Sequence, residues 1–340
     1  ASLLAVVAGS VLSGLFWLGL FSSLSSLMPA EVVAVPEKAV LRIDLRENLV
    51  DAPSRNPMSQ FNFATMSMGG QLTLYDALRA IEAAAADDRI SGIYINLSDM
   101  GTAEIAAIEE LRQAILDFKA ASGKFVVAYN SIYTQWGYYL ATAADRIYIE
   151  PEGSFEWAGL SMSTLFFKGL IDKLGVEMTI LRPTACKYKS AVEPYILPKM
   201  SDANREQMQE LVNSMWNTIA GSVAEARGID LETLNRITDK LEVSLPEDAL
   251  EHGFVDSLLY EDQMNDVFAE LGVQSDSDGQ YNFVTLGEYA LQVSADLKNI
   301  SADQVAIVYA DGAIVDGEGF GREIYGNTLA AKIAGVRDNE

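Results

Sequence analysis

A candidate catalytic base, Lys189, lies in the short stretch Tyr188–Pro194, which reads YKSAVEP. The stretch follows an apolar run, Val176–Leu181, whose composition predicts a β-strand. A lysine at the end of a strand, beside small residues, is placed to be partly desolvated. Burial lowers the pKa of an amine, so such a lysine can act as a base near neutral pH. The alternative interpretation is a surface lysine in a loop.

Two lysines compete for this role, because Lys187 lies only two residues before Lys189. In an extended segment both side chains point to the same face, and their mutual repulsion would help to lower a pKa. Glu193 could pair with either lysine, and a pair with Lys189 would raise the pKa of that lysine and oppose its use as a base. Ser190 adjoins Lys189 and either hydrogen-bonds to it or simply fills a turn.

The chain has a single cysteine, Cys186, and a single histidine, His252. A disulfide within the chain is therefore impossible, although Cys186 remains available for pairing between molecules. A Cys/His zinc cluster has too few ligands. A Ser-His-Asp triad would have to use His252, which lies near an apparent helix end where a capping or surface role is expected. We therefore expect no metal and no cofactor.

Charge and composition exclude several classes of protein. The 340 residues carry a net charge of −24, which argues against binding of nucleic acid and against electrostatic docking on anionic lipid. Hydrophobic residues make up 49% of the chain and charged residues 21%, which permits a sizeable core. The length is enough for about two domains.

The first 30 residues contain no charged side chain. Leu3–Leu24 is mostly apolar and is long enough to cross a bilayer core of roughly 30 Å as a helix. A cleaved signal peptide is the rival interpretation, but its apolar region is usually only about 7–15 residues long. The acidic residues Glu31 and Glu37 precede the first basic residue, Lys38. We therefore expect a single-pass inner-membrane anchor at residues 1–30, with the rest of the chain on the periplasmic side.

From Lys38 onward the hydrophobic pattern predicts strands that alternate with helices. Spacing of this kind is typical of βαβ units with right-handed crossovers in a parallel sheet. Asp51–Gly70 is predicted to be a loop, and a linker is predicted at residues 273–301. The predicted strands are Ala39–Leu45, Ile90–Leu97, Lys124–Tyr129, Arg146–Glu150 and Val176–Leu181. The predicted helices are Leu72–Ala86, Ile105–Phe118, Trp136–Ala144, Leu165–Leu174, Ser201–Arg227, Leu231–Leu241, Glu247–Glu251 and Glu261–Leu271.

Two segments of the chain share one hydrophobic pattern. VLRIDLRENLVD at Val40–Asp51 has the same hydrophobic positions as VAIVYADGAIVD at Val305–Asp316. A helical pattern follows each copy, at Thr73–Asp88 and at Thr328–Asn339. Chance similarity between two strand-turn-helix units is the alternative. Taken as real, the repeat predicts a second domain that begins near Ala302 and is cut off at Glu340.

The motif YKSAVEP resembles the lysine motif of the signal peptide peptidase A family (SppA, protease IV), which are membrane-anchored serine/lysine peptidases. Tyr138–Ala141 and Leu170–Leu174 are similar to the amino-terminal half of the long form, and Asp311–Ile314 to the start of its second half. The resemblance implies tandem ClpP/crotonase-like α/β domains. It assigns residues 38–272 to the domain with the base, Lys189, and residues 302–340 to the start of the domain with the serine. It also implies a homo-oligomer, with four protomers expected.

The first copy lacks the groups that the family uses for nucleophilic attack. The nucleophile turn of the family is similar to Thr134–Tyr138 here, where Gln135 stands at the nucleophile position. The oxyanion loop corresponds to Leu97–Thr102, which has one glycine and an acidic residue, Asp99, whose charge would disfavour an oxyanion. Ser131 remains a minor candidate nucleophile. The serine is therefore expected beyond residue 340.

Three functions are compatible with these features. The leading hypothesis is an endopeptidase that degrades cleaved signal peptides with a Ser/Lys dyad. This chain supplies the lysine and is expected to be inactive by itself. The second is a non-catalytic crotonase-like scaffold that binds peptides or assembles. Acyl-CoA chemistry on the same fold is a weaker third, because a location outside the cytoplasm would separate the domain from CoA.

Overall fold

The computed structural model describes residues 34–46, 48–52, 61–62, 67–68, 71–98, 103–181, 186–275, 278–296, 305–319 and 323–337. Its contacts divide the chain into two compact units. The first unit runs up to Tyr129 and includes Ala143–Asp145 and the chain from Glu261 onward, and the second comprises Asn130–Thr142 and Arg146–Tyr260.

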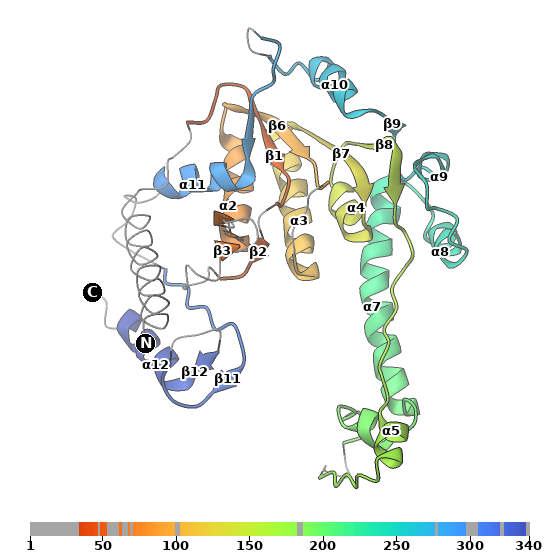
Figure 1. Cartoon of the computed structure of the whole chain (residues 1–340). Coiled ribbons are helices and arrows are strands. Elements are labelled where there is room, and N and C mark those ends of the chain that lie inside the picture. Colours follow the sequence, from red (N-terminus) through yellow and green to blue (C-terminus); the bar gives the residue numbers. More distant parts are fainter. Residues whose placement is uncertain are drawn as a thin grey trace, which may run out of the picture. The chain divides into compact units, whose positions relative to one another are not determined.

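The first unit is built on a parallel sheet in which the strand order is β10-β1-β6-β7. Most residues of β1 and β6 are buried, as expected for apolar strands that are covered on both faces. Helix α2 packs against α3 and against α11 (Figure 1). The predicted α/β pattern is therefore confirmed here. The strands are β1 (Ala39–Ile43), β6 (Ile90–Ile95), β7 (Phe125–Tyr133) and β10 (Phe283–Thr285), and the helices are α2 (Leu74–Ala86), α3 (Ile105–Ser122) and α11 (Leu286–Asp296).

Smaller elements complete the first unit. The segment predicted to be a loop contains a short antiparallel pair, β3 with β4. Part of the region after the second unit is helical, as predicted. These elements are β3 (Phe61–Asn62), β4 (Ser67–Met68), η2 (Glu261–Gln263) and α10 (Met264–Glu270).

The second unit has a buried aromatic cluster at its centre, formed by Tyr133, Tyr138, Phe155, Trp157 and Phe254. The rings of Tyr138 and Phe155 lie 4.8 Å apart, and the Tyr138 hydroxyl donates a hydrogen bond to the Phe254 carbonyl at 2.8 Å. The strands β8 (Arg146–Phe155) and β9 (Ser257–Leu258) pair in parallel. The helices are α4 (Gln135–Ala141), α5 (Lys168–Lys173), α6 (Glu193–Ile196), α7 (Asp202–Arg227), α8 (Leu231–Asp239) and α9 (Pro246–Glu251).

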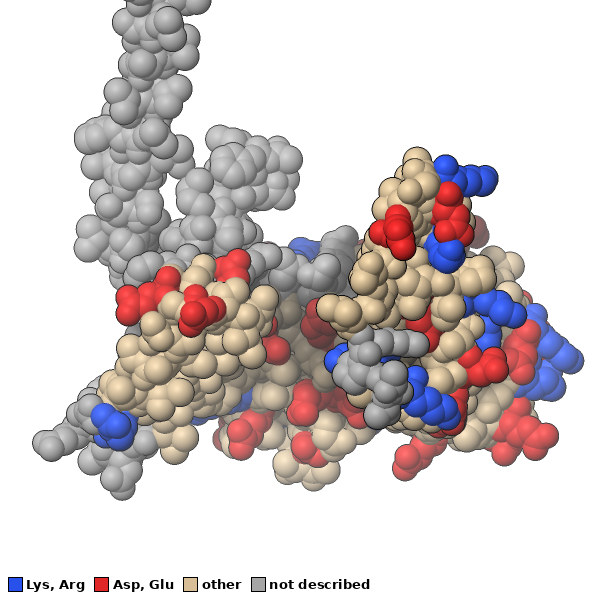
Figure 2. Space-filling view, turned by 90° about the horizontal axis from the view of Figure 1, so that it is seen from below, with Lys and Arg blue, Asp and Glu red and all other residues tan. Residues whose placement is uncertain are grey.

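Helix α7 connects the core of the second unit to a projecting arm, which we define as residues 161–181, 186–200 and the first half of α7 (Figure 1). The C-terminal half of α7 supplies Ile219, Ala220, Val223 and Ala224 to the core. The arm instead exposes large apolar side chains, such as Leu165 at 76% and Leu181 at 94%. Its end also carries interspersed basic and acidic side chains (Figure 2).

The predicted strand at Val176–Leu181 is wrong. These residues lie in the arm without regular secondary structure, and Val176, Met178 and Leu181 are exposed. A strand needs a neighbouring strand to satisfy its backbone donors and acceptors, and an apolar run cannot supply one by itself.

The same local arrangement occurs near both ends of the first unit. Strand β2 (Asn48–Val50) pairs in parallel with β5 (Gln71–Thr73), which leads into α2. Strand β11 (Ile314–Val315) pairs in parallel with β12 (Ile324–Tyr325), which leads into α12 (Gly326–Arg337). Residues 305–310 form no strand, and their side chains are exposed.

The predicted anchor at residues 1–30 lies outside the described part of the chain. Among the residues that the structure describes, no helix combines the length and the apolar character needed to cross a membrane.

Candidate active-site lysine

Lys189 lies in a pair of consecutive turns in the arm. Its backbone N–H donates to the Cys186 carbonyl at 3.2 Å, and the N–H of Glu193 donates to the Ser190 carbonyl at 2.9 Å. Lys189 is exposed and Ser190 is half-buried. The expectation of a partly desolvated lysine at the end of a strand is therefore wrong for this structure, because the segment forms turns at the surface of the arm.

Lys187 has partners that change its expected role. Its Nζ lies 3.0 Å from the Tyr188 hydroxyl and 3.1 Å from Oε2 of Glu206, and it sits 4.7 Å from the centroid of the Tyr188 ring. The hydrogen bonds to Tyr188 and Glu206 raise the pKa of Lys187. Because the Glu206 carboxylate offsets its charge, Lys187 is a weak source of the repulsion that was expected to act on Lys189. The same turn also removes the extended geometry on which that expectation depended.

Glu193 is buried below the lysine turn. Its carboxylate accepts hydrogen bonds from the Ser201 N–H at 3.1 Å, from the Ser201 hydroxyl at 2.6 Å and from the Asn204 side-chain amide at 3.1 Å. Ser201 is also the N-cap of α7 and accepts from the Asn204 N–H. Sequence reasoning paired Glu193 with a lysine and missed these partners, although the Ser-x-x-Asn spacing at a helix start is a recognisable capping signal.

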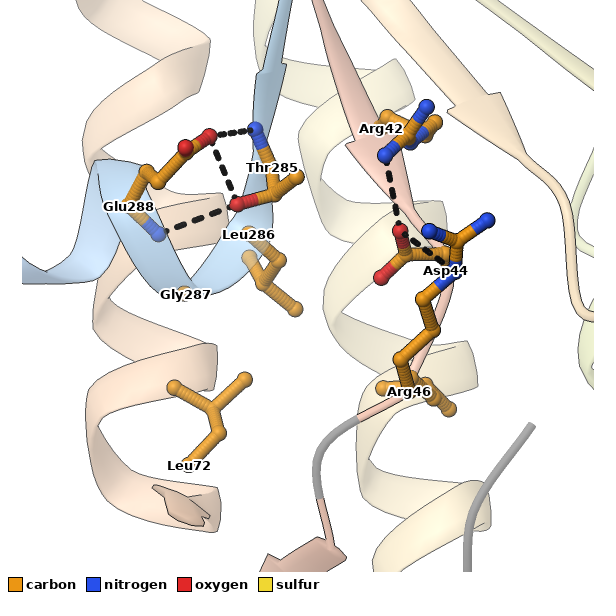
Figure 3. Close-up of a pocket in the computed structure, with 9 residues that line it drawn as sticks. Arg42, Asp44, Arg46, Leu72, Thr285, Leu286, Gly287 and Glu288 are labelled. Carbon is orange, nitrogen blue, oxygen red and sulfur yellow. Dashed lines mark hydrogen bonds and ion pairs between the residues drawn. The ribbon is translucent and has the colours of Figure 1, made fainter. Parts of the chain in front are cut away.

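Two cavities are candidate binding sites besides the lysine turn. One, of about 260 Å³, lies in the first unit at the ends of β1 and β10 (Figure 3). Asp44 lies 3.0 Å from Arg42 and 3.6 Å from Arg46, and Glu288 accepts from the N–H and hydroxyl of Thr285 at the start of α11. Asp44 is therefore paired with arginines, and Glu288 caps the start of α11. Both carboxylates have structural partners, so neither indicates a catalytic site in this cavity.

The other cavity, of about 380 Å³, lies in the arm. The apolar side chains that line it are Ile171, Val176, Met178, Tyr195 and Ile196. Tyr195 and Ile196 belong to α6, which directly follows the lysine turn. Lys168, Asp172 and Glu177 also line this cavity, so the cavity next to the segment with the candidate base is both apolar and charged.

The sequence of the region that contains both the turn and the arm was then compared with known proteins. Residues 118–274 match the model of peptidase family S49. Protease 4 of Salmonella typhi is 30% identical over 313 residues, which cover 88% of the chain and 49% of that relative. Protease 4 of Haemophilus influenzae is 31% identical over 323 residues, which cover 90% of the chain and 51% of the relative.

A third relative, the chloroplastic serine protease SPPA of Arabidopsis thaliana, is 28% identical over 266 residues, which cover 76% of the chain and 38% of the relative. These similarities confirm the resemblance to SppA proteases. The chain spans about half the length of the two Protease 4 relatives.

Within residues 118–274, Gln135 has a structural role. It follows the N-cap Thr134 and is 5% exposed. Its Oε1 accepts from the N–H groups of Ala158 and Gly159 at 3.2 and 2.9 Å, and its Nε2 donates to the Gly159 carbonyl at 3.2 Å. A carboxamide held in this way is no nucleophile. Asp99 of the predicted oxyanion loop lies outside the described residues.

The remaining sequence candidates of this region can also be placed. His252 is the C-cap of α9, where its N–H donates to the Asp248 carbonyl at 2.9 Å, so the predicted capping role is confirmed. Cys186 is a free, exposed cysteine. Ser131 is a half-buried residue of β7. The Tyr138–Ala141 run that resembles SppA is fully buried, so this similarity reflects core packing.

Proposed function

We propose that this chain is the lysine-bearing part of a serine endopeptidase that degrades cleaved signal peptides with a Ser/Lys dyad. Lys189 is the general base. The observation that carries the proposal is that the S49 match encloses the YKSAVEP turn, which presents Lys189 at the surface of the arm. No cofactor takes part in the proposed mechanism.

The nucleophilic serine is proposed to come from sequence beyond residue 340. Two observations support this. Gln135, which the resemblance places at the nucleophile position, is bound by backbone groups, and the chain spans only about half the length of its Protease 4 relatives. Lys189 is exposed in this chain, so another surface must cover it before it can act as a base in a closed site. The domain with the serine is the proposed cover.

Residues 273–301, which were expected to form a linker, contribute β10 and α11 to the first unit, where β10 pairs with β1 and α11 packs against α2. The proposed organisation is therefore a tandem one, with a first domain that begins at residue 38 and includes β10 and α11, and with the start of a second domain at 302–340. It is supported by the two parallel strand pairs that lead into α2 and α12. The cavity in the arm has apolar side chains, among them Ile171, Val176 and Met178, beside the charged residues Lys168, Asp172 and Glu177. The apolar part supports a peptide substrate, because signal peptides are rich in apolar residues.

Anchoring by Leu3–Leu24, with the domain on the periplasmic side of the inner membrane, is proposed from the uncharged span and its acidic flank. Protease added to intact spheroplasts is expected to digest the domain. Full protection, under conditions in which lysis allows digestion, would refute this topology.

The catalytic proposal is tested by two substitutions in the full-length protein. Lys189→Ala is expected to reduce peptide hydrolysis by at least about 10²–10⁴-fold, the usual contribution of a general base. Lys187→Ala serves as the matched control and should only weaken hydrolysis, because Lys187 is paired with Glu206. Activity close to wild type in Lys189→Ala would refute the proposal.

A scaffold function is the second candidate. The exposure of Lys189 and the structural role of Gln135 favour it, because neither residue is ready for catalysis in this chain. A full-length protein that binds a signal peptide but does not hydrolyse it would establish the scaffold.

A further inference from the structure

Glu193 stands out because it is buried in a part of the molecule that is otherwise open. It is 3% exposed, whereas Lys189, Ala191 and Tyr195 around it are exposed. Among the charged residues that the structure describes, it is the only one classed as buried. Removing a carboxylate from water is costly unless hydrogen bonds replace the lost solvation, so the surroundings of Glu193 must compensate for its burial.

That compensation comes from the first turn of α7. Three hydrogen bonds reach the carboxylate from Ser201 and Asn204, the N-cap residue and the third residue of the helix. The positive end of the dipole of a 26-residue helix adds a favourable interaction with a negative charge at this position. Glu193 is therefore held at a fixed place relative to α7.

The backbone of Glu193 carries this restraint to the lysine turn. Its N–H donates to the Ser190 carbonyl at 2.9 Å, which closes the turn directly after Lys189. Its own carbonyl accepts from the Leu197 N–H at 2.9 Å, so the residue also begins α6. At the other end, α7 is packed in the core through Ile219 and Val223. The lysine turn is thus linked to the core by one carboxylate and one continuous helix.

We infer that Glu193 is a positioning residue for Lys189, which it holds by fastening the lysine turn to the N-terminus of α7. The inference depends on the proposed role of Lys189 as the base. A base must lie within about 3 Å of the proton that it removes, and a displacement of about 1 Å can reduce the rate about 10²-fold. The hydrogen bonds of the buried carboxylate restrain the turn that carries Lys189, so Glu193 has a function that exceeds local stability.

The test compares Glu193→Ala, Glu193→Gln and the control Glu210→Ala in the full-length protein. Glu210 is an exposed glutamate of the same helix. Glu193→Ala is expected to lower kcat by about 10- to 100-fold with KM nearly unchanged. Glu193→Gln keeps a carbonyl oxygen for the donors of Ser201 and Asn204 and should recover most of kcat. The pH at which the acidic limb of the kcat profile titrates should be the same in all three variants, and Glu210→Ala should match wild type.

Two results would overturn the inference. The first is a folded Glu193→Ala protein with wild-type kcat. The second is a Glu193→Gln protein that is as impaired as Glu193→Ala and titrates at a shifted pH, because the charge of Glu193 would then act on the pKa of Lys189. If Glu193→Ala does not fold, Ser201→Ala replaces it, with the same expected split between kcat and KM. Failure of the proposed function itself is recognised separately, since Lys189→Ala would then retain activity.

Discussion

At the scale of single residues, Gln135 is held by hydrogen bonds that leave it no role as a nucleophile. Its Oε1 accepts two backbone N–H groups, from Ala158 and Gly159, and its Nε2 donates to the Gly159 carbonyl. Gly159, one of the hydrogen-bond partners of Gln135, adopts a φ of +79°, a backbone conformation that favours glycine at this position. Gln135 therefore stabilises the fold and has no nucleophilic group.

Gln135→Ala should lower the free energy of unfolding by about 2–3 kcal/mol, because it leaves buried backbone donors and an acceptor without their partners. Urea denaturation of the 340-residue chain would measure this. Gln113→Ala, an exposed glutamine of α3, is the matched control and should change stability by no more than about 0.5 kcal/mol. Equal effects of the two substitutions would show that the bonds of Gln135 contribute little.

A chemical probe tests the same residue-scale interpretation. A serine-reactive fluorophosphonate should not label the 340-residue chain, because neither Ser131 nor Ser190 is proposed as a nucleophile. The full-length protein, treated in parallel, should be labelled. Stoichiometric labelling of the shorter chain would place the nucleophile within it and refute the two-domain proposal.

At the scale of elements, α7 has two glycines with opposite consequences. Gly228 ends the helix with a φ of 65°, and its N–H donates to the carbonyls of Ala224 and Glu225. Gly221 lies within the helix, where an added Cβ would meet no atom within 4 Å. The end of α7 therefore requires a glycine at position 228. Gly221, in contrast, only lowers the stability of the helix, because glycine has a low helix propensity.

We expect Gly221→Ala to raise the free energy of unfolding by about 0.5–1 kcal/mol and Gly228→Ala to lower it by about 1–2 kcal/mol. The two variants carry the same substitution in one helix and therefore control for each other in a thermal or urea melt. A loss of stability in Gly221→Ala would indicate that α7 needs flexibility at that point.

A second element-scale feature is the junction between α2 and α11, which depends on Asp87. Its carboxylate is hydrogen-bonded by Arg89 and accepts from the Tyr289 hydroxyl of α11 at 2.9 Å. Hydrogen bonding from Arg89, aided by Tyr289 and only partly opposed by burial, lowers the pKa of Asp87 to about 2. A carboxyl group with a depressed pKa in the folded state stabilises the protein above its unfolded pKa and loses this contribution as the pH falls.

Asp87→Asn should therefore cost about 1–2 kcal/mol at pH 7, and the difference from wild type should shrink as the pH falls from about 4 to 2. Urea titrations at several pH values in this range would measure it. Asp88→Asn, an exposed neighbour, should have little effect at any of these pH values. A difference that stays constant down to pH 2 would contradict the role of the charge.

At the scale of the whole molecule, the exposed apolar side chains of the arm indicate a surface that binds another protein chain. Soluble surfaces rarely present so many large apolar side chains together, and exposed apolar patches of this kind usually mark interaction sites. We propose that protomers assemble through such surfaces into a homo-oligomer, with four copies expected.

Light scattering of the full-length protein in detergent, corrected for detergent mass, should give a mass above that of one protomer. Leu165→Glu and Leu181→Glu, which place charges on the exposed apolar surface of the arm, should lower that mass. A monomer in the unaltered protein would remove the proposal. Dissociation by Leu291→Glu, an exposed leucine of α11 in the first unit, but not by the arm substitutions, would move the interface elsewhere.

The sequence by itself determined the features that depend on near neighbours in the chain. The buried strands β1 and β6, the N-cap Ser201 and the terminal Gly228 of α7 follow from apolar runs and capping chemistry. Tertiary structure decided what depends on distant partners. It left Val176–Leu181 without a neighbouring strand, exposed Lys189, paired Lys187 with Glu206 and buried Glu193 against Ser201 and Asn204. Hydrogen bonds, burial and charge depend on distance in space, and residue spacing along a chain fixes that distance only within one helix, strand or turn.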